Sequence, residues 1–203
     1  MQKWLAHRLE SASTALVKRD SAGRRLLTAL ALTPVLGMAA LTGSATAATY
    51  GPYNIRAENS NSCMDVRGGT GSTADGAVVQ QYQCLGSTQT NQQWYFRDTG
   101  DGLTYYVTAR NSGKCLDVRG GTAATANGTA LQQFQCLGYA QSNQRWYLTR
   151  GPVGSTFNLR AANSNRCADV TGGPGAIADG IALQIWDCLG SAATNQEWYL
   201  TTP

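Results

Sequence analysis

Residues 63–94 read CMDVRGGTGSTADGAVVQQYQCLGSTQTNQQW, and the same pattern returns at 115–146 and at 167–198. The two cysteines of each segment are 21 residues apart, and each of them recurs 52 residues further along the chain. An aspartate, a glutamine, an asparagine and a tryptophan keep this register without a gap. So long and regular a period indicates a chain built from three copies of one structural unit.

Each unit contains short segments that are typical of β-strands. In the first unit these are residues 53–57, 63–67, 77–83 and 93–96, with glycine, asparagine, aspartate and serine clustered between them. No stretch after residue 47 has a sustained helical period. We therefore predict an all-β domain of about twelve strands, because four strands recur in each unit.

The end units look like the middle one, which favours closed three-fold packing over a linear array with capped ends. A packed centre needs large apolar side chains at equivalent positions in all three units. We predict a core of identical tryptophans and valines: Trp94, Trp146, Trp198, Val66, Val118 and Val170.

The first 47 residues are typical of an export signal. Arg24 and Arg25 precede the uncharged run 26–41, and the small residues 45–47 then form an A-x-A cleavage pattern. The run is shorter than the roughly 20 residues that span a bilayer, and Pro34 interrupts it. We predict a cleaved signal peptide at 1–47, with an uncleaved anchor as the alternative, and no membrane span afterwards. The mature domain is then 48–203, with repeats 48–99, 100–151 and 152–203.

Charge and composition exclude several classes of protein. The chain has a formal charge of +4, yet residues 48–203 contain ten basic and ten acidic side chains. A neutral domain argues against nucleic acid as a partner. The single histidine, His7, precedes residue 47, which excludes Ser-His-Asp and Cys-His catalysis and His-ligated zinc from the mature chain. We expect no metal and no cofactor.

All six cysteines follow residue 47, and an even number in an exported chain favours disulfides over free thiols. We therefore expect a secreted, extracellular protein. Spacing alone leaves the fifteen possible connectivities open.

Each unit ends in Asn-Gln-x-Trp and also carries Cys-x-Asp-Val and Gln-x-aromatic-x-Cys. This combination resembles the Q-x-W repeat of ricin-type lectins, also known as family 13 carbohydrate-binding modules, over nearly all of residues 50–202. The resemblance implies a β-trefoil, in which three hairpins cap a six-stranded barrel and each repeat offers one sugar site. It also implies one disulfide within each repeat: Cys63–Cys84, Cys115–Cys136 and Cys167–Cys188.

The family's binding residues are the aspartate after the first cysteine, the aromatic residue two positions before the second, and the Asn-Gln pair. By position, the first site is Asp65, Tyr82, Asn91 and Gln92; the second is Asp117, Phe134, Asn143 and Gln144; the third is Asp169, Trp186, Asn195 and Gln196. Phe134 has no polar edge, so the second site departs most from the pattern.

Other interpretations of these positions stay open. The three rings have an alternative role as core residues, and the three aspartates one as turn acceptors. Asp75, Asn127 and Asp179 each precede a glycine, which is typical of tight turns, and we interpret them as structural. Asp187, beside the ring of the third site, either tunes that site or faces solvent.

These observations predict a secreted, non-enzymatic lectin. We expect a monomer with up to three weak sites for galactose- or pentose-type glycans or plant polysaccharide. One alternative is a protein-binding trefoil, such as an inhibitor or a toxin-associated subunit. Another is a glycoside hydrolase, which needs two carboxyl groups facing one bond, whereas each predicted site has one.

Overall fold

The computed structural model describes residues 47–203. The predicted signal peptide lies outside the described residues, apart from its last position. None of the helices in the described part is long and apolar enough to cross a membrane. The elements are β1 (Thr49–Ala57), β2 (Cys63–Val66), β3 (Val79–Tyr82), η1 (Thr90–Gln92), β4 (Gln93–Asp98), β5 (Thr104–Ala109), β6 (Cys115–Val118), β7 (Thr129–Phe134), η2 (Ser142–Gln144), β8 (Trp146–Arg150), β9 (Phe157–Ala161), β10 (Cys167–Val170), β11 (Leu183–Trp186), η3 (Thr194–Gln196) and β12 (Trp198–Thr201).

Six of the strands form a closed barrel. Going round it, β1 pairs β4, β4 pairs β5, β5 pairs β8, β8 pairs β9, β9 pairs β12, and β12 returns to β1. All six pairings are antiparallel, and each repeat supplies two of the strands. Because the barrel closes on itself, none of these strands is left with an unpaired edge.

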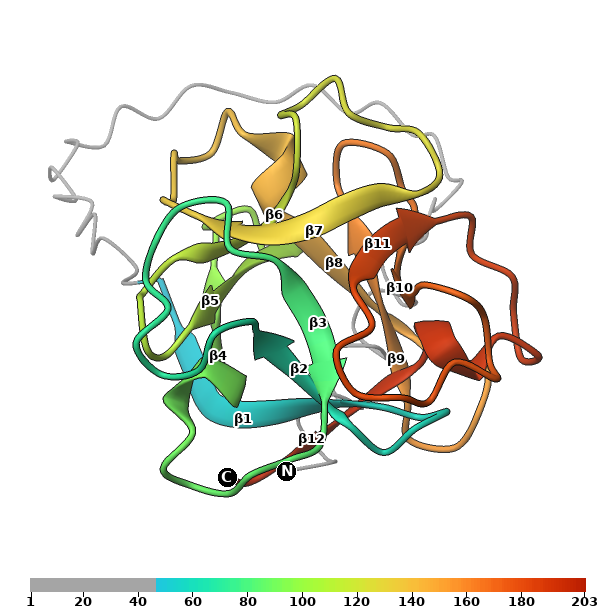
Figure 1. Cartoon of the computed structure of the whole chain (residues 1–203). Coiled ribbons are helices and arrows are strands. Elements are labelled where there is room, and N and C mark those ends of the chain that lie inside the picture. Colours follow the sequence, from blue (N-terminus) through green and yellow to red (C-terminus); the bar gives the residue numbers. More distant parts are fainter. Residues whose placement is uncertain (1–46) are drawn as a thin grey trace, which may run out of the picture. The chain divides into compact units, whose positions relative to one another are not determined.

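The other six strands form three hairpins, β2–β3, β6–β7 and β10–β11. The hairpins touch one another, since β11 pairs β7 and isolated bridges join Val78 to Gln132 and Gln80 to Ala182. Figure 1 shows β3, β7 and β11 around the middle of the view. A six-stranded barrel capped by three hairpins in pseudo-three-fold arrangement is a β-trefoil, so the predicted fold is confirmed.

Three tryptophans join the barrel to the cap. Trp94, Trp146 and Trp198 are fully buried, as predicted, and so are the three valines at 66, 118 and 170. Each indole Nε1 donates to the backbone carbonyl that follows the first cysteine of its repeat, at 2.9, 2.9 and 3.1 Å. A buried indole needs such an acceptor, which gives the position a reason to be tryptophan in all three repeats.

The disulfides pair Cys63 with Cys84, Cys115 with Cys136, and Cys167 with Cys188, which confirms the pairing implied by the family resemblance. Each one ties the first residue of a hairpin to the segment that follows its second strand. In the chain-entropy model, closing a loop of about 20 residues stabilises the fold by roughly 3 kcal/mol.

Candidate functional site

Each predicted site lies on one cap hairpin and the short 3-10 helix after it. In the first repeat, Asp65 is on β2, Tyr82 ends β3 and Asn91 is in η1. The register sets Asp65 opposite Gln80 and Cys63 opposite Tyr82. Opposed residues share a face in an antiparallel pair, as do residues two apart on one strand. The carboxylate and the ring therefore project from the same face of the hairpin.

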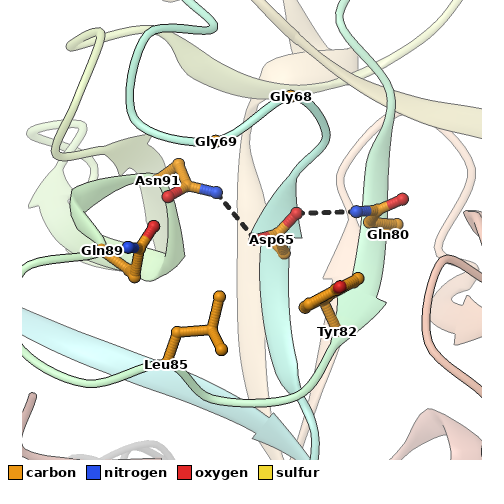
Figure 2. A pocket seen from close by; sticks show the side chains of 8 residues that line it. All are labelled: Asp65, Gly68, Gly69, Gln80, Tyr82, Leu85, Gln89 and Asn91. Carbon is orange, nitrogen blue, oxygen red and sulfur yellow. Dashed lines mark hydrogen bonds between the residues drawn. The ribbon is translucent and has the colours of Figure 1, made fainter.

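Two amides hold the Asp65 carboxylate in place. Gln80 Nε2 donates to Oδ1 at 2.8 Å, and Asn91 Nδ2 donates to Oδ2 at 2.7 Å. Figure 2 shows Asp65 between these two side chains, with Tyr82 and Leu85 on one side and the Gly68–Gly69 turn on the other. The second and third sites repeat the geometry, with all four equivalent distances between 2.7 and 2.8 Å.

The glutamine of the Asn-Gln pair supports the site from behind. Gln144 Nε2 donates to Asp117 Oδ2 at 3.0 Å and to the carbonyl of Gln135 at 2.9 Å. The Gln196 side chain makes the same two bonds, to Asp169 and to the carbonyl of Asp187, at 2.9 Å each. These glutamines link the carboxylate to the residue that follows the ring, so both recognition elements are fixed by one side chain.

Sequence reasoning missed the glutamine opposite each aspartate as part of the site: Gln80, Gln132 and Gln184. The sequence did hold a signal for this glutamine: it recurs in all three repeats two residues before the ring, and residues two apart on a strand lie on the same face. In the first two repeats an arginine orients it, since Arg67 Nε and Arg119 Nε donate to the Gln80 and Gln132 amide oxygens at 2.6 and 2.9 Å. In the third repeat Thr171 stands at the position of these arginines.

The three aspartates are buried, with 3–4% of their surface exposed. Burial raises the pKa of the Asp65, Asp117 and Asp169 carboxyls above the ordinary value of 3.8. The hydrogen bonds from the glutamine and asparagine side chains partly offset this rise, because they stabilise the ionised form. The interpretation of these residues as turn acceptors fails, because side-chain amides occupy their carboxylates.

One polar atom in each site has no partner. The amide oxygens of Asn91, Asn143 and Asn195 are buried and accept no hydrogen bond in the structure. Their amide nitrogens are used twice, by the aspartate and by the carbonyl of the valine after it, which fixes the orientation of the amide. The amide oxygens of Asn59, Asn111 and Asn163, outside the sites, are buried without a partner in the same way, so this feature alone does not identify a ligand site.

The first site is a hollow of about 280 Å³, lined by Asp65, Gly68, Gly69, Gln80, Tyr82, Leu85, Gln89 and Asn91. Gly68 and Gly69 have φ of 101° and 76°, a region that favours glycine, and their turn places no side chain in the hollow. Among the eight lining residues Asp65 alone is acidic. The hollow thus has one anion and one aromatic ring.

The predicted rings lie at the surface and not in the core. Tyr82 and Phe134 are half-buried, and Trp186 is 37% exposed, whereas the core tryptophans are fully buried. A leucine directly follows the second cysteine of each repeat, and Leu85, Leu137 and Leu189 are 47%, 48% and 62% exposed. Each site therefore offers apolar surface next to buried hydrogen-bonding groups.

A β-barrel capped by three hairpins, each with a buried carboxylate and an aromatic ring at the surface, defines a trefoil with three equivalent candidate sites. Residues 42–134 match the family model described as "Ricin-type beta-trefoil lectin domain-like", and residues 103–203 match "Ricin-type beta-trefoil lectin domain". The chain belongs to the ricin-type β-trefoil lectin family, whose fold binds carbohydrate.

Solved structures agree with this assignment. The designed three-fold symmetric protein ThreeFoil is 35% identical, with 76% of this chain and 100% of that chain covered and a TM-score of 0.64. An exo-β-1,3-galactanase from Clostridium thermocellum is 28% identical over 75% of this chain and 30% of that chain (TM-score 0.63). The ricin B-like lectin of Macrolepiota procera, solved in complex with lactose, shares the fold at 21% identity, covering 80% and 100% (TM-score 0.60).

Proposed function

We propose that the protein is a secreted, non-enzymatic lectin with three sugar sites, one per repeat, for galactose- or pentose-type residues of glycans or plant polysaccharide. The observation that carries the proposal is a carboxylate held by two side-chain amides beside an aromatic ring at the surface, repeated in all three repeats.

The chemistry of a pyranose fits these groups. One face of the sugar ring is lined by C–H bonds, and an aromatic side chain gains by covering it. The ionised carboxylate accepts hydroxyl protons, because its oxygens have lone pairs beyond those that the protein amides use. A vicinal diol above Asp65 would therefore satisfy the remaining lone pairs of the carboxylate.

Each site is expected to bind weakly. Hydroxyl groups already bond well to water, so a neutral hydrogen bond contributes about 1 kcal/mol and a charged one about twice that. One stacked ring and three or four such bonds, less the cost of ordering the sugar, predict a millimolar to high-micromolar Kd, about −4 to −6 kcal/mol. Three sites on one rigid body then raise the avidity for a polymer with repeated residues.

A hydrolytic role has less support. The hollow of the first site holds one carboxylate, and the acidic residue of the Asp75 turn is replaced by Asn127 in the second repeat. Glycoside hydrolysis requires two carboxyl groups about 5–10 Å apart across one bond. The match covers 30% of the galactanase to which the chain is similar, so most of that enzyme lies outside the matched region.

The test is titration of residues 48–203 with galactose, lactose, L-arabinose and D-xylose, followed by columns of arabinogalactan and xylan. We expect millimolar to high-micromolar binding of at least one sugar, retention on a polysaccharide, and no release of reducing sugar. The matched control is the triple variant Asp65→Asn, Asp117→Asn, Asp169→Asn, which should be folded and should not be retained. Flat titrations with all four sugars, or protein partners that free sugar cannot compete away, would refute the proposal.

A further inference from the structure

The turns Asp75-Gly76, Asn127-Gly128 and Asp179-Gly180 bond to a neighbouring repeat and not to their own. Asp75 Oδ1 accepts the backbone N–H of Gln135 at 2.8 Å, and the Gly76 N–H donates to the carbonyl of Gln133 at 2.9 Å. Gln133 and Gln135 are the two neighbours of Phe134. A turn in the first repeat thus holds the backbone on both sides of the ring in the second site.

The other two turns make the same pair of bonds. Asn127 Oδ1 accepts the N–H of Asp187 at 2.9 Å and Gly128 donates to Ile185, on either side of Trp186. Asp179 Oδ1 accepts the N–H of Gln83 at 2.6 Å and Gly180 donates to Gln81, on either side of Tyr82. The first repeat holds the ring of the second, the second that of the third, and the third that of the first.

The location of each ring explains why such bonds matter. Tyr82, Phe134 and Trp186 are the last residues of β3, β7 and β11. The N–H of the next residue lies beyond the strand and has no partner in its own hairpin ladder. The turn side chain supplies that partner, and it adds to the disulfide of the following cysteine in holding the strand end. At the third site the turn lies beside the ring, since a Cβ added to Gly128 would come within 3.9 Å of Trp186 Cζ3.

We propose that Asp75, Asn127 and Asp179 are positioning residues for sugar binding, each acting on the site of the next repeat. The proposal rests on the lectin function above and deepens it: the three sites form a closed cycle in which each depends on another repeat.

The residues that meet at the third site differ from those at the other two sites in a way that supports this role. At the first and second sites the turn residue is an aspartate and the residue after the ring is a glutamine: Asp179 with Gln83, and Asp75 with Gln135. At the third site both types change, and Asn127 bonds to Asp187. Asn127 Nδ2 donates to Asp187 Oδ2 at 2.7 Å, and Arg166 Nε lies 3.0 Å from the other carboxylate oxygen. A second carboxylate at position 127 would repel Asp187, so the two positions differ together. The Asp187 side chain is thus held by the turn while 58% of it stays exposed.

Trp186 provides a reporter for the test, since it is the exposed tryptophan of the described residues. The experiment measures lactose affinity by the change in Trp186 fluorescence, acrylamide quenching of that fluorescence, and the thermal midpoint. The variant is Asn127→Ala, and the matched controls are Asp75→Ala and Asp179→Ala, which remove the same contact from the other two sites. We expect Asn127→Ala to weaken lactose binding at the third site about tenfold, as loss of a positioning hydrogen bond implies, and to raise quenching.

The two controls should leave the Trp186 titration unchanged while also lowering the thermal midpoint, since each removes a hydrogen bond between repeats. The double variant Asn127→Asp, Asp187→Gln recreates the pairing of the other repeats and should restore wild-type affinity, whereas Asn127→Asp alone should not. Equal losses in all three alanine variants, or an unchanged third site in Asn127→Ala, would overturn the proposal. If lactose fails to bind the wild type, the galactose-type function is wrong, and the quenching data still decide whether the turn positions the ring.

Discussion

Replacing Asp169 by asparagine removes the charge of the third site with almost no change in shape. In the structure Gln184 donates to Oδ1, and Asn195 and Gln196 both donate to Oδ2. Either orientation of the new amide therefore turns an N–H toward at least one N–H donor. The new side chain also presents a neutral oxygen, or none, to the sugar hydroxyl that the carboxylate would accept.

The size of the effect follows from that hydrogen bond. A bond to a charged group contributes about 1.5–3 kcal/mol, which corresponds to roughly a 10- to 150-fold loss of affinity at the third site. The unfolding free energy should change less. Removing a desolvated charge favours the folded state, while the donor facing another donor opposes it.

The assay is titration of Trp186 fluorescence with lactose, because the other tryptophans of the described residues are buried in the core. Asp117→Asn is the matched control, since it makes the same change in the second site and should leave the Trp186 titration as in the wild type. Our reasoning fails if Asp169→Asn keeps the third-site affinity within threefold, or if Asp117→Asn reduces it equally.

Three further predictions concern acidity, the disulfides and the core. Lactose affinity should fall as pH drops through the raised pKa of the site aspartates, because protonation removes the acceptors. The same groups have the opposite effect on the free protein: their contribution to folding stability is full below pH 3.8 and is lost as pH rises through the raised pKa. Calorimetric titrations between acid and neutral pH should therefore show affinity increasing with pH, and a flat profile would contradict this. Replacing Cys63 and Cys84 by alanine should lower the unfolding free energy in urea by about 3 kcal/mol, and an unchanged urea midpoint would contradict the cross-link estimate. Trp94→Phe strands the Met64 carbonyl and should cost about 1–3 kcal/mol in the same assay, with no change in the Trp186 titration.

Repetition made much of the fold predictable from the sequence. The register of 52 residues identifies equivalent positions, and an apolar residue that is the same in all three copies, such as Trp94, is a good candidate for a packed centre. Alternation and turn residues located the strands to within a few positions. The 3-10 helices were not foreseen, because a three-residue turn such as Thr90–Gln92 is too short to produce a period.

The candidate site was predicted less completely. Ring, carboxylate and asparagine were found by family resemblance, but Gln80 was missed, since its contact with Asp65 depends on strand register. Asp75 was interpreted as a residue of its own turn, whereas its carboxylate reaches Gln135 in the next repeat. The local sequence indicates that residues 75 and 76 form a turn, but it does not indicate which residue of another repeat the turn contacts. The contact between Asp75 and Gln135 is therefore seen only in the folded chain.

The pairing of β1 with β12 has a practical consequence. Asn54 to Ala57 lie in register with Thr201 to Trp198, so the first and last strands are neighbours in the barrel, away from the cap hairpins. A short linker could join them, and new termini could be opened in an exposed loop such as Gly100–Gly102 between the first and second repeats. Circular permutants of this kind would begin with a different repeat while keeping the barrel pairings, and so offer a way to alter chain order without altering the molecule's three-fold geometry.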